Sequence, residues 1–295
     1  MFTGSSVAII TPMTMDGQVD FDILEQLVTW HIGQGTNALI VAGTTGESAT
    51  LNKSEHLEVI KVAANAAKGK IFVIAGIGSN STAQTIELSS AVEKINVDGY
   101  LVVTPYYNKP PQNGLIKHFN EVADAVSRPV MLYNVPGRTG VDLLPETVAK
   151  LAQHPRIFGI KEATGDLDRV HIIRDLCGRD FRLYSGDDPT SREFMLLGGH
   201  GVVSVTANVA PKLMSLMCAE ALSGNEQRAL EIDNSLSALH RDLFIESNPI
   251  PVKWALEEMG LVSGGIRSPL IPLSNSAQLI VKQALESAGI ETLNE

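Results

Sequence analysis

Eight short apolar segments recur along the chain, and their spacing limits the folds that the chain can adopt. Each is five or six residues long and ends at a turn-forming or polar residue. Most are continuous apolar runs rather than alternating ones, which is typical of parallel strands buried on both faces. The segments are residues 7–12, 38–43, 71–76, 100–105, 130–134, 157–161, 181–185 and 201–206.

Helical patterns separate these segments, so that one strand follows the previous one after roughly 20 to 33 residues. Eight such units predict a closed parallel (β/α)8 TIM barrel, the fold class that we expect here. A doubly wound parallel sheet is the alternative. The even size of the units and the absence of a composition break favour the barrel.

Helix starts are predicted from capping residues. We expect a cap at Asp22 with Glu25, at Asn52 with Glu55, at Ser81 with Gln84, and at Asp188 before Pro189.

After residue 209 the pattern becomes wholly helical, over residues 211–223, 225–245, 249–259 and 275–288. We therefore divide the chain into a barrel core at 1–210 and a C-terminal helical region at 211–295 that packs on it. Lys253 and Trp254 lie in this region, and we interpret them as packing or solvated surface residues.

Composition excludes several classes of function. The net charge is −10 and no run of Lys or Arg is present, which argues against nucleic-acid binding. Cys177 and Cys218 match no metal spacing and are expected to be reduced. The first residues lack a secretion signal and no apolar run reaches membrane-spanning length, so we expect a cytoplasmic protein.

In a parallel barrel the active site forms at the carboxyl ends of the strands, so these ends are where chemistry is expected. They carry one amine, one guanidinium, several hydroxyls and many glycines, but no histidine. A metal-dependent mechanism is therefore disfavoured, and no metal or other cofactor is predicted.

Lys161 ends the apolar run 157–161, where a buried strand has little reason to carry an amine. Removal from water favours the neutral amine, which can attack a ketone and form a Schiff base. The alternative is a structural ion pair with Glu162 or Asp187. The residue pattern alone leaves both interpretations open.

Two further segments could bind an anionic substrate. The turn at residues 43–48 is rich in backbone N–H groups that can hold a carboxylate, although an ordinary turn is also common. Arg138 follows a strand end and is either a carboxylate clamp or a surface arginine. A non-catalytic binding barrel, and a retaining glycosidase using carboxylates such as Glu47, are the alternatives from other classes.

Taken in order, the strand-end segments resemble the dihydrodipicolinate synthase family over essentially the whole chain. The matching segments are residues 43–50, 103–108, 133–140, 159–165, 185–188 and 248–253. The resemblance implies that pyruvate forms a Schiff base with Lys161 and that the enamine attacks L-aspartate 4-semialdehyde. The product would be 4-hydroxytetrahydrodipicolinate, the committed intermediate toward diaminopimelate and lysine.

The same resemblance implies roles for other residues. Tyr133, Thr44 and Tyr107 would form a hydroxyl relay, with Tyr107 supplied by a neighbouring subunit of a homotetramer built as a dimer of dimers. The implied substrate-binding residues are Thr45, Arg138, Gly186 and Val203. Related lyases that cleave sialic acid or keto-deoxy sugar acids usually lack the arginine, and they are the second interpretation.

Family members inhibited by lysine bind it at a subunit interface. The corresponding positions here are Ser48, Ala49, Lys53, His56, Asn80, Gln84 and Tyr106. Strongly inhibited members commonly have a histidine and a glutamate where this chain has Lys53 and Gln84. A cation gained and a carboxylate lost both disfavour a bound lysine, so we expect weakened feedback inhibition.

Overall fold

The computed structural model describes residues 1–293 and contains a closed barrel of parallel strands. The barrel closes because β1 pairs with β8 as well as with β2, which confirms the predicted (β/α)8 fold over a doubly wound sheet. The strands are β1 Gly4–Ala8, β2 Ala38–Val41, β3 Phe72–Gly76, β4 Gly99–Val103, β5 Val130–Asn134, β6 Ile157–Glu162, β7 Arg182–Ser185 and β8 Gly201–Ser204.

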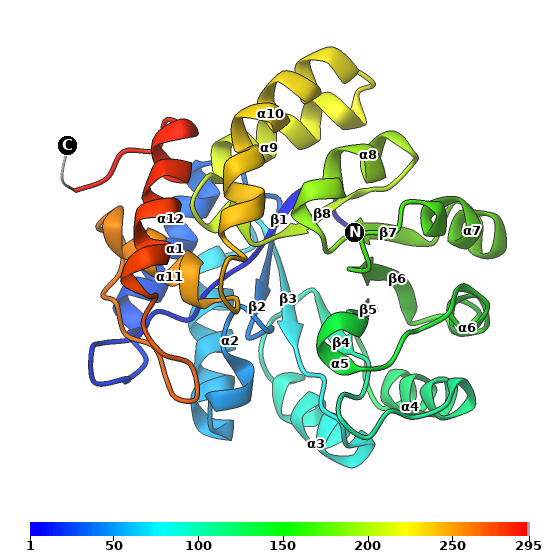
Figure 1. Ribbon diagram of the computed structural model, residues 1–295. Coiled ribbons are helices and arrows are strands. Elements are labelled where there is room, and N and C mark those ends of the chain that lie inside the picture. Colours follow the sequence, from blue (N-terminus) through cyan, green and yellow to red (C-terminus); the bar gives the residue numbers. More distant parts are fainter. Residues whose placement is uncertain (294–295) are drawn as a thin grey trace.

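Helices surround the strands in a ring (Figure 1). They are α1 Phe21–Gly33, α2 Lys53–Ala67, α3 Thr82–Val92, α4 Gln112–Asp124, α5 Pro136–Thr139, α6 Pro145–Leu151, α7 Asp168–Cys177 and α8 Ser191–Leu196. Short 3-10 helices follow three strands, η1 at Ser48–Thr50, η2 at Asp188–Thr190 and η3 at Thr206–Asn208.

Four C-terminal helices, α9 Pro211–Leu222, α10 Glu226–Asp242, α11 Ile250–Glu258 and α12 Asn275–Ser287, gather on one side of the ring (Figure 1). They match the four helices predicted after residue 209. One apolar cluster joins barrel residues such as Val7 to Met214 of α9 and Val281 of α12. No helix in residues 1–293 is long and apolar enough to cross a membrane.

The strands alternate their side chains between two apolar clusters, as the period of a strand requires. In β2, Leu39 and Val41 pack with the helices, whereas Ala38 and Ile40 belong to a second cluster that fills the barrel. Tyr133 and Val203 belong to this inner cluster. Both of these site candidates therefore face the barrel interior.

The first strand lies three residues earlier than predicted. Its residues Ser5 and Ser6 are polar but fully buried, and the Ser6 hydroxyl donates to the Val202 carbonyl of β8 at 2.6 Å. Buried serines do not produce the apolar run from which the strand was predicted.

The capping predictions have mixed outcomes. Asn52 and Glu55 form a reciprocal capping box at α2, and Ser81 accepts from the Gln84 amide at α3, as predicted. The prediction for α1 was wrong, since Asp20 rather than Asp22 accepts the first-turn bond, from the Ile23 amide at 3.0 Å.

The prediction for Asp188 was also wrong. Its carboxylate accepts from the backbone amides of Val205 and Thr206, at 2.9 and 3.0 Å, and so holds the end of β8 instead of its own helix.

Candidate active site

Lys161 lies near the carboxyl end of β6, and its side chain points toward Tyr133 of β5. The two residues are partners in the register of the paired strands. The Lys161 amine stands 4.2 Å from the centroid of the Tyr133 ring, and each residue is 6% exposed. Within residues 1–293 no carboxylate forms an ion pair with this amine, so the structural ion pair considered above is not formed.

Gly186, which follows β7, leaves open the space beside this amine. A Cβ atom at Gly186 would lie 2.8 Å from the Lys161 Cε and 2.7 Å from the Ala163 Cβ. Both distances are far below a normal carbon–carbon contact, so any other residue would displace the lysine. Glycine at this position therefore leaves the Lys161 side chain room to take up its observed conformation.

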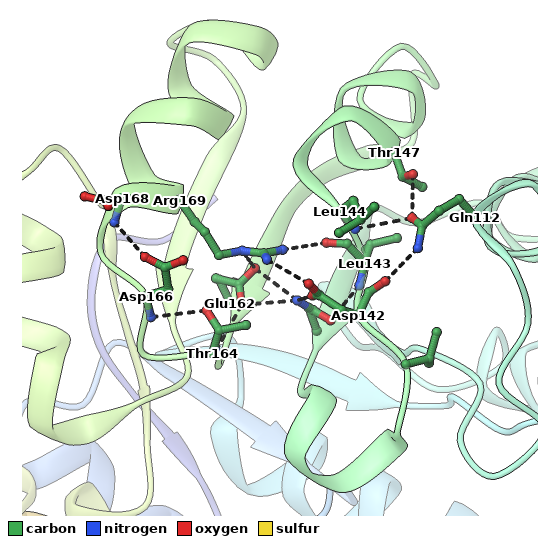
Figure 2. Close-up of polar contacts among 12 residues, drawn as sticks. Gln112, Asp142, Leu143, Leu144, Thr147, Glu162, Thr164, Asp166, Asp168 and Arg169 are labelled. Atoms are coloured by element: carbon green, nitrogen blue, oxygen red, sulfur yellow. Dashed lines mark hydrogen bonds and ion pairs between the residues drawn. The ribbon is translucent and has the colours of Figure 1, made fainter.

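A buried polar network fixes the strand ends that carry Tyr133 and Lys161 (Figure 2). The Asn134 amide donates to both oxygens of Glu162 at 3.2 Å and to Asp142 at 2.7 Å. Arg169 of α7 donates to Glu162 at 3.1 Å, to Asp142 at 3.0 Å and to the Leu143 carbonyl at 2.6 Å.

This network assigns Glu162 to structure. Burial raises the pKa of the Glu162 carboxyl, while Arg169, Asn134 and Thr164 stabilise its charged form. Sequence reasoning missed Asn134, Asp142 and Arg169. The available signal was the position of Asn134 and Glu162, each directly after a candidate catalytic residue.

The turn after β2 is held by buried contacts. Thr45 is 3% exposed, and its hydroxyl accepts a 3.0 Å bond from the Asn248 amide of the C-terminal region. Thr11 donates to the Gly46 carbonyl at 2.7 Å. The turn is thus a fixed structure that presents Thr44 and Thr45 together.

Lys253 is not the solvated surface residue that we predicted. It is 2% exposed and forms an ion pair with Glu47, 206 residues earlier in the chain. Burial lowers the pKa of Lys253, and the neighbouring Glu47 carboxylate opposes this shift. Trp254, by contrast, packs partly buried against the apolar core as expected. The ion pair also removes Glu47 as a free carboxylate for a glycosidase.

A cavity of about 530 Å³ opens beside the strand ends. Thr44 and Arg138 line one part of it, and Lys53 and Gln84 line another. Thr44 also lines a smaller space of about 30 Å³ together with Tyr133. Hydroxyl and guanidinium groups therefore meet at the cavity next to the buried pair of Lys161 and Tyr133.

Most residues of the lysine set gather in the same cavity. Ser48, Ala49, Lys53, His56, Gln84 and Tyr106 all line it, whereas Asn80 does not. The Asn80 carbonyl accepts instead from the Asn108 amide at 2.8 Å. Lys53 pairs with Glu87, a lining residue that sequence reasoning missed.

Two other predicted site residues, Val203 and Tyr107, differ in burial. Val203 is 1% exposed and packs in the barrel interior with Tyr133. Tyr107 is 89% exposed, has φ of 74°, and lines neither of the two cavities described above. Within one chain the structure does not bring its hydroxyl to Lys161.

The chain is similar to known proteins over nearly all of its length. The model of the dihydrodipicolinate synthetase family matches residues 1–288. The 4-hydroxy-tetrahydrodipicolinate synthase of Methylococcus capsulatus is 56% identical over 98% of this chain and 100% of its own length. The enzyme of the same name from Alcanivorax borkumensis is 54% identical, covering 98% and 99% of the two chains.

Solved structures agree with these sequence relatives. The chloride-inhibited dihydrodipicolinate synthase from Acinetobacter baumannii, solved in complex with pyruvate, superposes with a TM-score of 0.97 at 52% identity. The comparison covers 99% of this chain and all of the other. A family match over the full barrel, together with relatives identical at more than half of their positions, shows that this chain belongs to the dihydrodipicolinate synthetase family.

Proposed function

We propose that Lys161 carries the reaction of this chain through a Schiff base with pyruvate. The reaction itself follows from the family and its relatives. The chain is a lyase that condenses pyruvate with L-aspartate 4-semialdehyde to 4-hydroxytetrahydrodipicolinate, in diaminopimelate and lysine biosynthesis. The relatives support this activity over cleavage of sialic acid or keto-deoxy sugar acids.

The first steps form and use the imine. The Lys161 amine attacks the pyruvate ketone, water leaves, and the resulting cation acidifies the neighbouring methyl group. Loss of a methyl proton gives an enamine, whose carbon attacks the aldehyde of the second substrate and forms the new carbon–carbon bond. The amine of that substrate then attacks the imine carbon, which closes the ring and releases Lys161.

Tyr133, Thr44 and Tyr107 move the protons in this proposal. A tyrosine hydroxyl is a weak base at neutral pH, and a chain of hydrogen-bonded hydroxyls can shift protons in concert. The position of Tyr133 beside the Lys161 amine supports its role, and Thr44 shares the small cavity with Tyr133. Tyr107 is exposed, so it would act on the site of a neighbouring subunit in a homotetramer.

Two carboxylates must be bound in an acidic protein. Thr45 and the turn amides would hold the carboxylate of pyruvate. Arg138 lines the cavity and is anchored by its bond to the Asn248 carbonyl at 3.3 Å, so it can bind the carboxylate of the semialdehyde. Gly186 and Val203 would complete the walls beside Lys161.

The observation that carries the proposal is the buried Lys161 amine beside Tyr133 without a carboxylate partner in the described residues. A turnover assay with pyruvate and aspartate semialdehyde tests the substrate pair, with N-acetylneuraminate as the competing substrate. We expect consumption of the first pair only, and loss of turnover in Lys161→Ala. Release of pyruvate from N-acetylneuraminate would contradict the assignment.

Weakened inhibition by lysine is a separate prediction. Gln84 is uncharged and lines the cavity. Lys53 places a positive charge in the same cavity, and its ion pair with Glu87 partly neutralises that charge. We expect micromolar lysine to leave the initial rate unchanged, and Gln84→Glu to increase inhibition because it restores a carboxylate. Strong inhibition of the unmodified chain at micromolar lysine would refute the prediction.

A further inference from the structure

Glu47 and Lys253 form a buried ion pair that the reaction described above does not use. Their side chains are 1% and 2% exposed, and the amine lies 2.5 Å from the carboxylate. Lys253 is among the largest fully buried side chains of the described chain. Two charges are rarely removed from water in this way for stability alone, because the loss of hydration offsets most of their attraction.

The carboxylate partner belongs to the turn that carries Thr44 and Thr45. Glu47 has φ of 54° and ψ of 35°, a left-handed conformation that costs free energy for a residue other than glycine. Its second oxygen accepts from the Arg267 amide at 3.3 Å. The Arg267 guanidinium in turn donates to the Thr50 carbonyl at 2.8 Å, beyond the turn.

The lysine partner belongs to a segment that contacts the same turn a second time. Asn248, five residues before Lys253, donates to the Thr45 hydroxyl at 3.0 Å. The Asn248 carbonyl accepts from Arg138 at 3.3 Å. The segment 248–253 therefore contacts Thr45, Glu47 and Arg138, which come from two different strand ends.

We infer that Glu47 and Lys253 are positioning residues for pyruvate binding, holding the turn after β2 in the conformation that presents Thr44 and Thr45. The inference rests on the proposed role of Thr45 in binding the pyruvate carboxylate. An ion pair suits this task because it is directional. Apolar packing alone would hold α11 against the barrel without fixing the orientation of a strained turn.

Two single variants and one double variant test the inference. Glu47→Gln keeps the size of the side chain, and Lys253→Met keeps most of its length, while each removes one charge. We expect the KM for pyruvate to rise by about tenfold or more in each, with kcat changed less, because small displacements of a binding group are costly. Because the two residues act as one unit, the rise in the double variant should be smaller than the product of the two single effects.

Glu93→Gln is the matched control. Glu93 lies at the other end of the barrel, where it accepts from Tyr100 and Ser127 and pairs with Arg128. The variant Glu93→Gln is therefore expected to lower the melting temperature without changing the KM for pyruvate. If Glu47→Gln and Lys253→Met behave like this control, the pair is only structural and the inference is overturned.

Two complications are resolved by the same set. Each single variant leaves one charge of the pair buried without its partner, which can prevent folding, whereas the double variant leaves none. If only the double variant folds, the KM for pyruvate of this variant decides. A wild-type value overturns the inference, and a raised value supports the inference.

Borohydride trapping of pyruvate on wild-type Lys161 separates the positioning role from the proposed function. No wild-type adduct contradicts the proposed function, whereas an adduct with unchanged KM in the variants contradicts the positioning role alone.

Discussion

His31 of α1 is 1% exposed, and its Nδ1 lies 3.1 Å from the Thr36 hydroxyl. Burial lowers the pKa of His31 to about 3, because the charged ring would lose its hydration. Burial also lowers the pKa values of His118 and His200 to about 4. The folded protein therefore favours neutral histidines at these positions.

This arrangement predicts that acid weakens the fold. The unfolded state binds a proton at His31 below about pH 6.5, while the folded state does so only near pH 3. The stabilisation is complete above pH 6.5 and is lost as the pH falls through this window, by about 1.4 kcal/mol per pH unit for each such histidine. We expect His31→Gln to flatten the fall of the unfolding free energy between about pH 6 and pH 5.

The control is His171→Gln, which makes the same substitution at an exposed histidine, and the slope of His31→Gln should be flatter than that of this control. An unaltered slope in His31→Gln, measured by denaturant unfolding at each pH, would contradict the assignment.

Single residues differ in how well the sequence reveals them. Lys161 was found because an amine directly after a buried apolar run is unusual. Lys253 was misread because a lysine on an amphipathic helix is normally solvated, and its partner Glu47 lies 206 residues away. Contacts between distant segments leave no periodic signal, so the pair could be found only in the folded chain.

At the scale of elements, the ends of β5 and β6 are fixed by Arg169 from α7. This side chain is 9% exposed and bonds both Glu162 and Asp142 (Figure 2). The network therefore joins a helix to the two strands that carry Tyr133 and Lys161.

We predict that Arg169→Met destabilises the protein by about 3–5 kcal/mol, because it leaves a buried carboxylate without its partner. The turnover should fall as well, since the register of Tyr133 and Lys161 loses its support. Arg228→Met is a suitable comparison, because Arg228 pairs with Glu231 in an exposed ion pair, and such pairs contribute little to stability. Equal losses of unfolding free energy in the two variants would show that the network of Arg169 stabilises the protein no more than an exposed ion pair does.

The elements themselves were largely predictable from the sequence. Apolar runs located most strands, and the capping box at Asn52 located the start of α2. The register was not predictable, because it depends on bonds such as that of Asn134 to Glu162 between consecutive strands. The start of β1 was missed because its buried residues Ser5 and Ser6 are polar and interrupt the apolar pattern.

At the scale of the whole molecule, we expect a second copy of the chain to complete the site. Tyr107 stands 89% exposed in a left-handed backbone conformation, and its neighbour Tyr106 is 39% exposed. The Tyr107 amide donates to the Thr139 carbonyl at 3.3 Å, which fixes the segment against α5. An aromatic pair held in this way fits an interface with a second copy of the chain.

Mixed assemblies test whether Tyr107 acts across that interface. Tyr107→Phe and Lys161→Ala chains, each impaired alone, are co-expressed and purified together. If Tyr107 serves the neighbouring site, random pairing should restore about a quarter of the wild-type sites, because half of the dimers are mixed and each has one complete site. Activity no higher than the average of the two impaired proteins would place Tyr107 in its own subunit's site or outside the mechanism.

The central claim is that Lys161 forms the Schiff base, and intact mass after treatment with pyruvate and borohydride tests it most directly. Reduction makes the imine permanent, so its mass remains on the chain. We predict one pyruvyl adduct per wild-type chain and none on Lys161→Ala. A wild-type chain without the adduct, or an adduct that persists in Lys161→Ala, would contradict the account.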